Sequence, residues 1–556
     1  MIRLLYISVF LLNATLLFSQ AGSLALPFDF PVLLSGNFGE LRSNHFHAGL
    51  DFKTQGATGK SLHTPADGYI MRATVSPGGY GRALYVMHDN GYVTVHGHLE
   101  RFMPGVEHRV RQCQYDNETF PVDIEFLPNE FPVKRGDIIA LSGNSGYSFG
   151  PHLHMEVRKA SDGQLINPMQ FYKQYVTDTK APVAHAFAVT PNKGHGVVNG
   201  ATNTITMHVK NGIVADTLSV WGVVGFSVKA YDFMDNTNNR YGVYSIELFV
   251  DGIKRFGSCI DSYFHNENRY INAFVDYERY YNDGDWFMRS YLLDNNPLGM
   301  LWADSERGWL NVDEERVYNV EYRLADYHGN KRSYKFAVKG EKNTIPSLAE
   351  LSGDYLYWFI NNEINLKGMR LSIPRGELFE NAILNILQLD NDSSVSHCYD
   401  LGGTAYPLYK KAILSLQVNE PNKYPHKKYY MRLKTKKGYR SVGGTLNDGW
   451  ITTNITVLGC YDVAVDTVAP VVKLLAEKNW SKNGKINFLI KDTETGVSSY
   501  KGYIDDKFIL FEFCSKNGRL SCNLKREGVK RGKHKLKLHV SDVAGNETIV
   551  EKNIVY

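Results

Sequence analysis

Histidines gather at the start of this chain, where nine of the 18 lie within the first 160 of 556 residues. They stand at positions 45, 47, 63, 88, 96, 98, 108, 152 and 154. Imidazole binds transition metals and moves protons near neutral pH, and carboxylates are common partners in both tasks. The clustering therefore favours a site in which metal binding and acid-base chemistry are combined.

The first histidine segment, residues 45–52, alternates in the manner of a β-strand. An extended backbone places Phe46, Ala48, Leu50 and Phe52 on one side and His45, His47, Gly49 and Asp51 on the other. His and Asp are ordinary zinc ligands, and Gly49 leaves room between His47 and Asp51. Taken alone, the segment is equally typical of a half-buried strand with solvent-facing histidines.

Two further segments repeat this alternation. In residues 150–157, His152, His154 and Glu156 share one face of a predicted strand, and in residues 92–99 the shared face carries His96 and His98. Each pattern is weak evidence by itself. Three such segments within about 110 residues, all with an apolar opposite face, favour one metal site.

Longer blocks contain these residues: H-A-G-L-D at 47–51, H-G-H-L at 96–99 and S-G-N-S-G-Y-S-F-G-P-H-L-H-M-E-V at 142–157. Together with V-K-R-G-D-I-I-A-L-S-G at 133–143, they resemble the lysostaphin-type, or LytM-like, zinc endopeptidases. The resemblance covers residues 35–170 or so. It implies a compact, mainly antiparallel β domain that hydrolyses peptide bonds in bacterial peptidoglycan.

The resemblance also implies roles for individual residues. One Zn²⁺ per chain would be held by His47, Asp51 and His154, with His98 and His152 as the catalytic pair. Three such ligands leave a fourth tetrahedral position for water, and nearby imidazoles can accept and return its proton. His45 is the reserve ligand. The sequence does not decide which of His98 and His152 is the general base, and His96 stands where the family often has Tyr.

Turn signals and repeats predict the domain organisation. Asn90-Gly91 links two alternating runs and predicts a β-hairpin. The hexapeptide at 178–183 is echoed at 466–471, and a D-x-x-G-N turn follows each copy, at Asp326 and Asp542. We expect a mainly β protein with five parts: a signal peptide (1–20), the peptidase domain (21–175), an immunoglobulin-like module with an insertion (178–340), a β-rich module without an identifying motif (345–465) and an immunoglobulin-like β-sandwich (466–556).

The first twenty residues predict export. Arg3 precedes an apolar run from Leu4 to Phe18, which small and polar residues follow. The run is short for a membrane span, and no later stretch is apolar for long enough, so no transmembrane segment is expected after signal removal. A retained signal anchor is the alternative. We expect the periplasm, the cell envelope or the extracellular space as the location.

Composition narrows the function classes. The chain is 43% hydrophobic, and 62 Lys and Arg stand against 58 Asp and Glu, which excludes a disordered chain. A net charge of +4 does not indicate nucleic acid as a partner. Six scattered cysteines exclude a disulfide scaffold, although Cys514 and Cys522 could bridge one hairpin. The oligomeric state is not determined by the sequence.

Three functions remain open. The leading hypothesis is an exported zinc endopeptidase acting on peptidoglycan stem peptides or cross-bridges. The first alternative is a catalytically silent LytM-like protein that binds or regulates other envelope or cell-wall enzymes. The second makes adhesion or envelope assembly by the β modules the main purpose. In the leading hypothesis, the long segment Arg101 to Pro132 is expected to be a loop that controls access to the metal.

Overall fold

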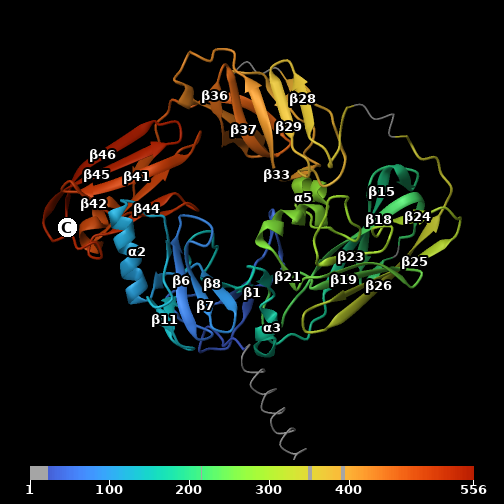
Figure 1. Cartoon of the computed structure of the whole chain (residues 1–556), viewed down its shortest axis with the longest axis horizontal. Coiled ribbons are helices and arrows are strands. Elements are labelled where there is room, and N and C mark those ends of the chain that lie inside the picture. Colours follow the sequence, from blue (N-terminus) through green and yellow to red (C-terminus); the bar gives the residue numbers. More distant parts are fainter. Residues whose placement is uncertain (1–22, 215, 348–352, 390–394) are drawn as a thin grey trace, which may run out of the picture.

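The computed structural model describes residues 23–214, 216–347, 353–389 and 395–556. The predicted signal peptide therefore lies outside the described residues. The prediction of a mainly β protein is confirmed, since almost all described elements are strands in antiparallel sheets. In Figure 1 four β units follow one another around a ring, and the C-terminal unit returns to the N-terminal domain.

The N-terminal domain is built on one large sheet with the strand order β1-β4-β13-β8-β7-β6-β10. The strands are β1 (Leu34–Gly36), β4 (Leu50–Lys53), β13 (His152–Lys159), β8 (Tyr92–Gly97), β7 (Arg82–His88), β6 (Gly68–Val75) and β10 (Val122–Glu125). Strand β11 (Pro132–Val133) pairs with β6, and β14 (Leu165–Ile166) pairs with β13. A separate pair consists of β2 (Leu41–Arg42) and β3 (His45–Phe46).

The pairing of the central strand brings the three histidine segments together. Strand β13 lies between β4 and β8, with His154 opposite Asp51 on one side and opposite Gly97 on the other. The predicted hairpin is confirmed, because β7 and β8 pair directly across the Asn90-Gly91 turn. Leu153, Met155 and Val157 fill the core beneath the sheet, so the alternate residues of β13 face the opposite side.

The segment Arg101 to Pro132 is not the loop that we expected. It contains β9 (Arg101–Phe102), helix α2 (Pro104–Asp116) and the edge strand β10. Val106 and Val110 of α2 are fully buried in the domain core. Strand β9 joins β5 (Ser61–His63) and β12 (Ile138–Leu141) in a small sheet. The apolar positions of a helix and an edge strand therefore fix this segment to the domain.

Residues 183–340 form an eleven-stranded sheet system whose core continues into the N-terminal domain. Its strands are β15 (Val183–Val198), β16 (Ile205–Lys210), β17 (Ile213–Val214), β18 (Leu218–Tyr231), β19 (Ser245–Val250), β20 (Ile253–Cys259), β22 (Met288–Arg289), β23 (Leu301–Ala303), β24 (Leu310–Val312), β25 (Val317–Ala325) and β26 (Lys331–Gly340). The insertion carries β21 (Ser262–Tyr263), α4 (Ile271–Phe274) and α5 (Tyr277–Asp283). Phe46 and Ala48 pack in this module's core, and β21 pairs with β14.

The third unit has two five-stranded sheets around a separate core. One contains β28 (Asn362–Leu366), β29 (Met369–Ile373), β33 (Pro407–Gln417), β37 (Trp450–Val457) and β36 (Thr445–Asn447). The other contains β31 (Leu387–Leu389), β32 (Cys398–Asp400), β38 (Cys460–Val465), β34 (Tyr429–Thr435) and β35 (Gly438–Gly443). Strands β27 (Asp354–Leu356) and β30 (Ala382–Leu384) form a further pair.

The C-terminal unit packs two four-stranded sheets over one core, as a small sandwich does. They are β39 (Val471–Leu474), β40 (Lys485–Lys491), β44 (Arg519–Asn523) and β43 (Glu512–Cys514), and β42 (Lys507–Ile509), β41 (Val497–Ile504), β45 (Lys533–Asp542) and β46 (Glu547–Val555). Short helices are α3 (Met169–Tyr172) and α6 (Trp480–Asn483). The immunoglobulin-like interpretation and the exact domain limits stay predictions.

The C-terminal unit is docked on helix α2, as Figure 1 shows. Glu527 accepts hydrogen bonds from Arg111, at 2.7 Å, and from Tyr115. Leu510 of the C-terminal unit is buried in the core cluster of the N-terminal domain. The first and last units of the chain therefore share an interface with both charged and apolar contacts.

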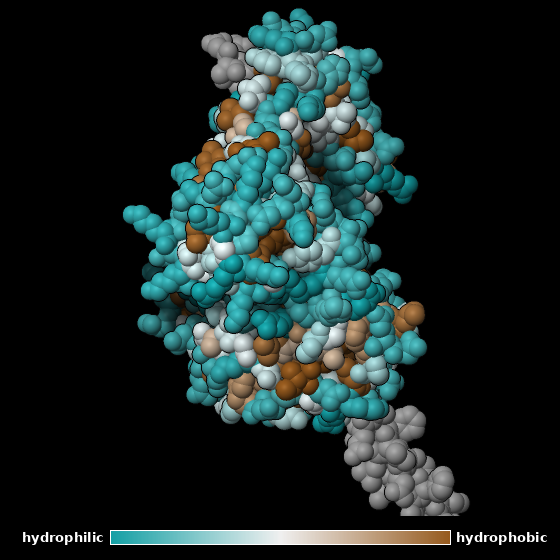
Figure 2. Space-filling view, turned by 90° about the vertical axis from the view of Figure 1, so that its left-hand side faces the viewer, coloured by the Kyte–Doolittle hydropathy of each residue, from teal (hydrophilic) through white to brown (hydrophobic). Residues whose placement is uncertain are grey.

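One face of the molecule is largely polar. Figure 2 shows a mostly hydrophilic face on which hydrophobic residues form small, separate patches. Among the residues that the structure describes, no helix has the length and apolar character needed to cross a membrane.

The cysteine positions favour a bridge that the sequence did not suggest. The Sγ atoms of Cys398 and Cys460 lie 2.9 Å apart on the paired strands β32 and β38. Cys514 is instead opposite Arg519 in its hairpin, so Cys522 is not its cross-strand neighbour. All six cysteines are free thiols in this structure.

We predict that mild oxidation with excess oxidised glutathione joins Cys398 to Cys460, because the two thiols are already within reach of exchange. Peptide mapping by mass spectrometry under non-reducing conditions should recover this pair. Cys398→Ser, which leaves Cys514 and Cys522 in place, is the matched control and should show no intramolecular bridge. A Cys514 to Cys522 bridge in the wild-type protein would contradict this prediction.

Candidate metal centre

His47 and Asp51 flank a tight approach of the chain to the central strand. His47 lies between β3 and β4, Asp51 lies within β4, and both are buried. Gly49 between them faces the backbone of β13, where an added Cβ would come within 2.2 Å of the Met155 carbonyl oxygen. Only glycine therefore allows His47 and Asp51 to lie against β13 in this way.

Three potential ligand atoms converge at this point. The distance is 2.9 Å between His47 Nε2 and His154 Nδ1, and 3.0 Å from each of these nitrogens to Asp51 Oδ1. Ligand bonds of 2.0–2.1 Å in a tetrahedron give an edge of about 3.3 Å, so a small expansion accommodates one metal ion. The three residues predicted as ligands are thus brought together.

Hydrogen bonds on the far side of each ring fix its orientation. His47 Nδ1 donates to the carbonyl oxygen of Asn37 at 2.7 Å, and His154 Nε2 donates to Glu156 Oε1 at 3.0 Å. Since neither oxygen can donate, both ring protons are committed. His47 Nε2 and His154 Nδ1 therefore face each other and Asp51, an arrangement in which a proton or a metal cation can be shared.

The charges at the centre agree with this requirement. Burial alone would raise the pKa of Asp51, but the two neighbouring histidines hold it well below its usual range, so the carboxylate stays ionised. Burial lowers the pKa of His47 to about 4. Burial also acts to lower the pKa of His154, but hydrogen bonds to Asp51 and Glu156 outweigh it and raise this pKa to about 9. A proton is thus attracted to the position where a metal would bind.

Glu156, Tyr80 and Arg158 form a supporting layer that the sequence analysis did not identify as part of the site. Glu156 is fully buried and accepts hydrogen bonds from Tyr80 and, at 2.8 Å, from Arg158 Nε. Burial would raise its pKa, but His154 and Arg158 lower it to about 2. Tyr80 also stacks on the His154 ring. The alternation of β13 placed Glu156 on the site face, but nothing in the sequence pointed to Tyr80.

Asp51 is also held from its outer side. Arg42 donates from a terminal nitrogen to Asp51 Oδ2 at 2.6 Å, which leaves Oδ1 for the two histidines. Arg42 is paired in turn with Glu40 at 3.5 Å. Asp51 thus directs Oδ2 to Arg42 and Oδ1 to the two histidines, as expected for a carboxylate that binds a metal through a single oxygen.

His98 and His152, the predicted catalytic pair, lie next to the three ligand atoms. Their ring centroids are 4.7 Å apart, and His152 Nε2 is 3.6 Å from Asp51 Oδ1. His98 Nδ1 donates to the Ser145 carbonyl and His152 Nδ1 to the Gly150 carbonyl, at 2.9 and 2.8 Å. The Nδ1 proton of each ring is therefore committed to the backbone. His98 adopts a left-handed backbone conformation, φ 61°, which is uncommon for a residue other than glycine.

Two other histidines have different surroundings. His45 is exposed and its Nδ1 bonds the Ser43 carbonyl, so the reserve ligand does not join the cluster. His96 is fully buried, and its Nε2 pairs with the Thr94 hydroxyl at 2.9 Å. His96 thus belongs to a buried chain of polar side chains, His88, Thr94 and His96. It occupies the position at which the lysostaphin-type family often has Tyr.

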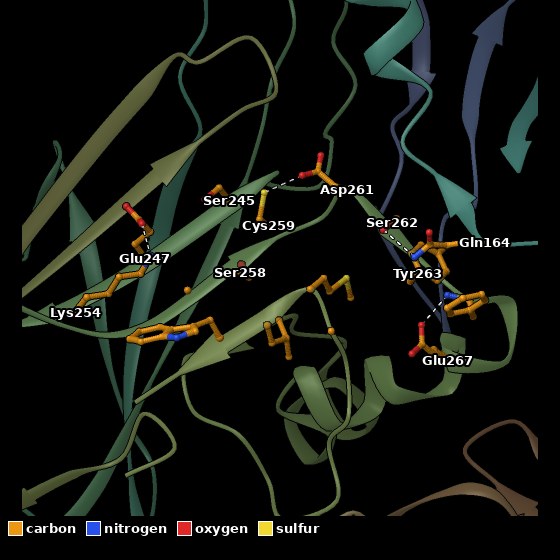
Figure 3. Close-up of a pocket in the computed structure, with 16 residues that line it drawn as sticks. Gln164, Ser245, Glu247, Lys254, Ser258, Cys259, Asp261, Ser262, Tyr263 and Glu267 are labelled. Carbon is orange, nitrogen blue, oxygen red and sulfur yellow. Dashed lines mark hydrogen bonds and ion pairs between the residues drawn. The ribbon is translucent and has the colours of Figure 1, made fainter. Parts of the chain in front are cut away.

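A large surface hollow lies elsewhere. A cavity of about 660 Å³ is lined by β19, β20 and the insertion of the second unit, with Gln164 at its rim. Figure 3 shows Glu247 paired with Lys254 on one side and Cys259 directed at Asp261 on the other. None of the five predicted site residues is among its lining residues. The size of a hollow is therefore not a guide to the chemistry here.

Known proteins are similar to parts of this chain. A curated metalloprotease of Haemophilus influenzae, itself uncharacterized, is 33% identical over 123 residues, which cover 22% of this chain and 20% of that protein. The DD-carboxypeptidase/endopeptidase Mpg of Neisseria meningitidis is 28% identical over 158 residues, or 28% of this chain and 30% of Mpg. The matches thus span less than a third of the curated relatives. They confirm the resemblance to lysostaphin-type metallopeptidases that the motifs predicted.

A solved structure and a family model also match the chain in part. The catalytic domain of lysostaphin from Staphylococcus simulans has 23% sequence identity and a TM-score of 0.19, and covers 26% of this chain and 92% of that domain. A family model described as a Zu5-like domain matches residues 353–466. That match falls on the β-rich unit for which the sequence analysis found no identifying motif.

We predict that His47→Ala abolishes metal binding while His45→Ala leaves it intact, because only His47 directs a lone pair at Asp51 and His154. The two histidines are two residues apart on the same segment, so they are matched controls for each other. Metal content per chain should be measured by inductively coupled plasma mass spectrometry after dialysis. Unchanged metal in His47→Ala would refute the assignment.

We predict that Glu156→Gln weakens metal affinity by about 10- to 100-fold, since loss of the charge removes the group that orients His154 and increases its basicity. Competition with a chromogenic chelator measures the effect. Glu125→Gln, on the exposed side of β10, is the control and should bind as the wild type does. Equal affinity in both variants would show that Glu156 does not support the ligand.

Proposed function

We propose that this protein is an exported, zinc-dependent endopeptidase that hydrolyses peptide bonds in bacterial peptidoglycan. The observation that carries the proposal is the convergence of three potential ligand atoms, His47 Nε2, Asp51 Oδ1 and His154 Nδ1, beside two further imidazoles. The similarity to curated metalloproteases supports the same class of chemistry.

The donor set fits zinc. Two imidazole nitrogens and one carboxylate oxygen are a common ligand set of catalytic zinc sites, in which one position is left open. We propose one ion per chain, held by His47, Asp51 and His154. When bound, zinc supplies Lewis-acid chemistry, because it lowers the pKa of water and polarises the scissile carbonyl.

His98 and His152 then supply proton transfer. Burial, together with the nearby His154 and His152, lowers the pKa of His98 to about 3, so its ring is neutral at pH 7 and can accept a proton. The backbone carbonyls of Ser145 and Gly150 hold the two rings with Nε2 directed away from the loop. One imidazole can take the proton of the attacking water, and the other can stabilise the oxyanion or protonate the leaving amine.

The proposed substrate is a stem peptide or cross-bridge of the cell wall. A Neisseria relative is named a DD-carboxypeptidase/endopeptidase, which is consistent with this substrate class. The predicted signal peptide would place the enzyme in the periplasm, the cell envelope or the extracellular space, where such peptides occur. A catalytically silent protein would not need to keep all five ligand and proton-transfer positions filled with competent residues.

The direct test is digestion of defined peptidoglycan fragments. Purified mature protein should convert cross-linked peptides to smaller products, detected by mass spectrometry, and a chelator should stop the conversion. Readdition of zinc should restore it. Absence of any cleavage by metal-loaded protein would refute the proposed activity.

We predict that His98→Ala and His152→Ala retain their zinc but lose about 10²- to 10⁴-fold in turnover, which is the usual contribution of a general acid or base. Initial rates on a cross-linked peptide and metal content should be measured on the same preparations. His108→Ala, an exposed histidine on α2, is the control and should have normal values. Near-normal turnover in either active-site variant would remove that residue from the catalytic pair.

A further inference from the structure

A second group of potential ligands lies between the N-terminal domain and the second unit. Asp178 precedes β15, Asp232 directly follows β18 and Asp326 directly follows β25. Each offers one carboxylate oxygen, and these oxygens all lie within 4.8 Å of one another. Three strands that begin or end at the same edge of the module thus bring three buried carboxylates together.

Two of these carboxylates have an oxygen without a hydrogen-bond partner. Asp232 is 2% exposed and its Oδ1 is unpartnered, and Asp178 is 8% exposed with an unpartnered Oδ2. Asp326 is different, because its Oδ1 accepts from the backbone of Gly329 and Asn330 and its Oδ2 from the Asn330 side chain. Burying an anionic oxygen without a hydrogen-bond donor is costly in free energy. Asp178 and Asp232 therefore need a partner that the protein chain does not supply.

The neighbouring His328 does not fill this role. His328 Nδ1 is 3.7 Å from Asp178 Oδ2, beyond hydrogen-bond distance. Its Nε2 donates to the Val176 carbonyl at 2.8 Å. Nδ1 is itself buried without a partner. His328 therefore leaves Asp178 Oδ2 without a hydrogen bond.

The repeated module at the end of the chain provides an internal comparison. Asp466, Asp492 and Asp542 occupy the corresponding positions and also lie within 4.8 Å of one another. There, the Thr495 hydroxyl donates to Asp466 Oδ2 at 2.6 Å, and Gly496 N donates to Asp492 Oδ1 at 2.6 Å.

The residue that corresponds to Thr495, three positions after the central aspartate, is Asp235 in the second unit. An ionised carboxylate cannot donate to Asp178 as the Thr495 hydroxyl donates to Asp466. The two copies thus share the acidic positions but differ in how the carboxylates are satisfied.

We propose that Asp178, Asp232 and Asp326 bind one calcium ion at the junction of the N-terminal domain and the second unit. Carboxylate oxygens are the ligands that calcium prefers, and bond lengths of 2.3–2.6 Å place oxygens on opposite sides of the ion about 5 Å apart. A cavity of about 10 Å³ adjoins Asp178 and Asp232, which is room for about one small ion or water.

Other cations fit this group less well. Zinc favours nitrogen and sulfur ligands, whereas this group offers mainly carboxylate oxygens. Magnesium demands near-ideal octahedral geometry and usually keeps several waters, for which so small a cavity has no space. Burial, reinforced by Asp178, raises the pKa of Asp232 to about 8, which shows how strongly the uncompensated group resists ionisation. A bound divalent cation would keep the carboxylates charged.

The proposed ion would also steady the metal centre through Asn37. Asp232 pairs through its backbone with Tyr241, and the next residue, Gly242, exchanges two hydrogen bonds with the Asn37 side chain, at 2.8 and 2.9 Å. The carbonyl of the same Asn37 accepts the ring proton of His47. A short chain of contacts thus leads from the acidic group to a proposed zinc ligand.

The test is equilibrium dialysis of the full-length, calcium-depleted protein against Ca²⁺, with bound metal counted by mass spectrometry. We expect one Ca²⁺ per chain and a higher midpoint of thermal unfolding with Ca²⁺ than without it. Asp232→Asn and Asp178→Asn keep side-chain size and should each lose at least tenfold in affinity. Asp492→Asn, the corresponding change in the C-terminal unit, is the control and should bind as the wild type does.

Several outcomes would overturn the proposal. The wild-type protein could bind no Ca²⁺, or Asp178→Asn and Asp232→Asn could both bind as tightly as the wild type. Equal affinity for Mg²⁺ would reject calcium as the ion. Circular dichroism establishes that each variant is folded, and the wild-type measurement decides the matter even if one variant fails to fold. Zinc content, counted in the same samples, keeps this result separate from the peptidase proposal.

Discussion

The N-terminal domain is organised around one electrostatic constraint: three lone pairs must face one another at about 3 Å. His47 Nε2, Asp51 Oδ1 and His154 Nδ1 would repel one another without a cation between them. Each is therefore held from behind, by the Asn37 carbonyl, Arg42 and Glu156 respectively. The pairing of β13 with β4 sets the spacing, and the supporting groups set the protonation.

The second unit helps to position His47, because the segment that carries this residue packs against it. Phe46, directly before His47, is fully buried in the core of residues 183–340, and its carbonyl accepts a hydrogen bond from Tyr263. Leu50 and Phe52, only a few residues later, pack in the core of the N-terminal domain. The ligand segment is thus fixed at both ends by different hydrophobic cores. We infer that the peptidase fold alone would hold His47 less firmly than the whole chain does.

The sequence was sufficient for those features that depend on local alternation. The period of two in residues 45–52 and 150–157 placed His47, Asp51 and His154 on one face, and the Asn90-Gly91 turn predicted the hairpin that carries His98. Their convergence, however, depends on the register of β13 between two strands far apart in sequence. Tyr80 and Asn37 could not be found in this way, since each acts through a long-range contact from a loop. The segment after β9 was misjudged because its length suggested a loop, whereas Val106 and Val110 are spaced as on a helix.

Helix α2 carries part of the interface between the C-terminal unit and the N-terminal domain. Arg82, whose side chain is 5% exposed, lies between Glu107 of α2 and Glu512 of the C-terminal unit, and Arg526 contacts both acids. The network adds little net stability, but it disfavours other arrangements, because a displaced partner would leave the buried Arg82 unpaired. The β43–β44 hairpin of the same unit also places Lys516 against the Ser148 carbonyl, in the loop that orients His152. The C-terminal unit is therefore held beside the metal centre by contacts with helix α2, with Arg82 of β7 and with the Ser148 loop.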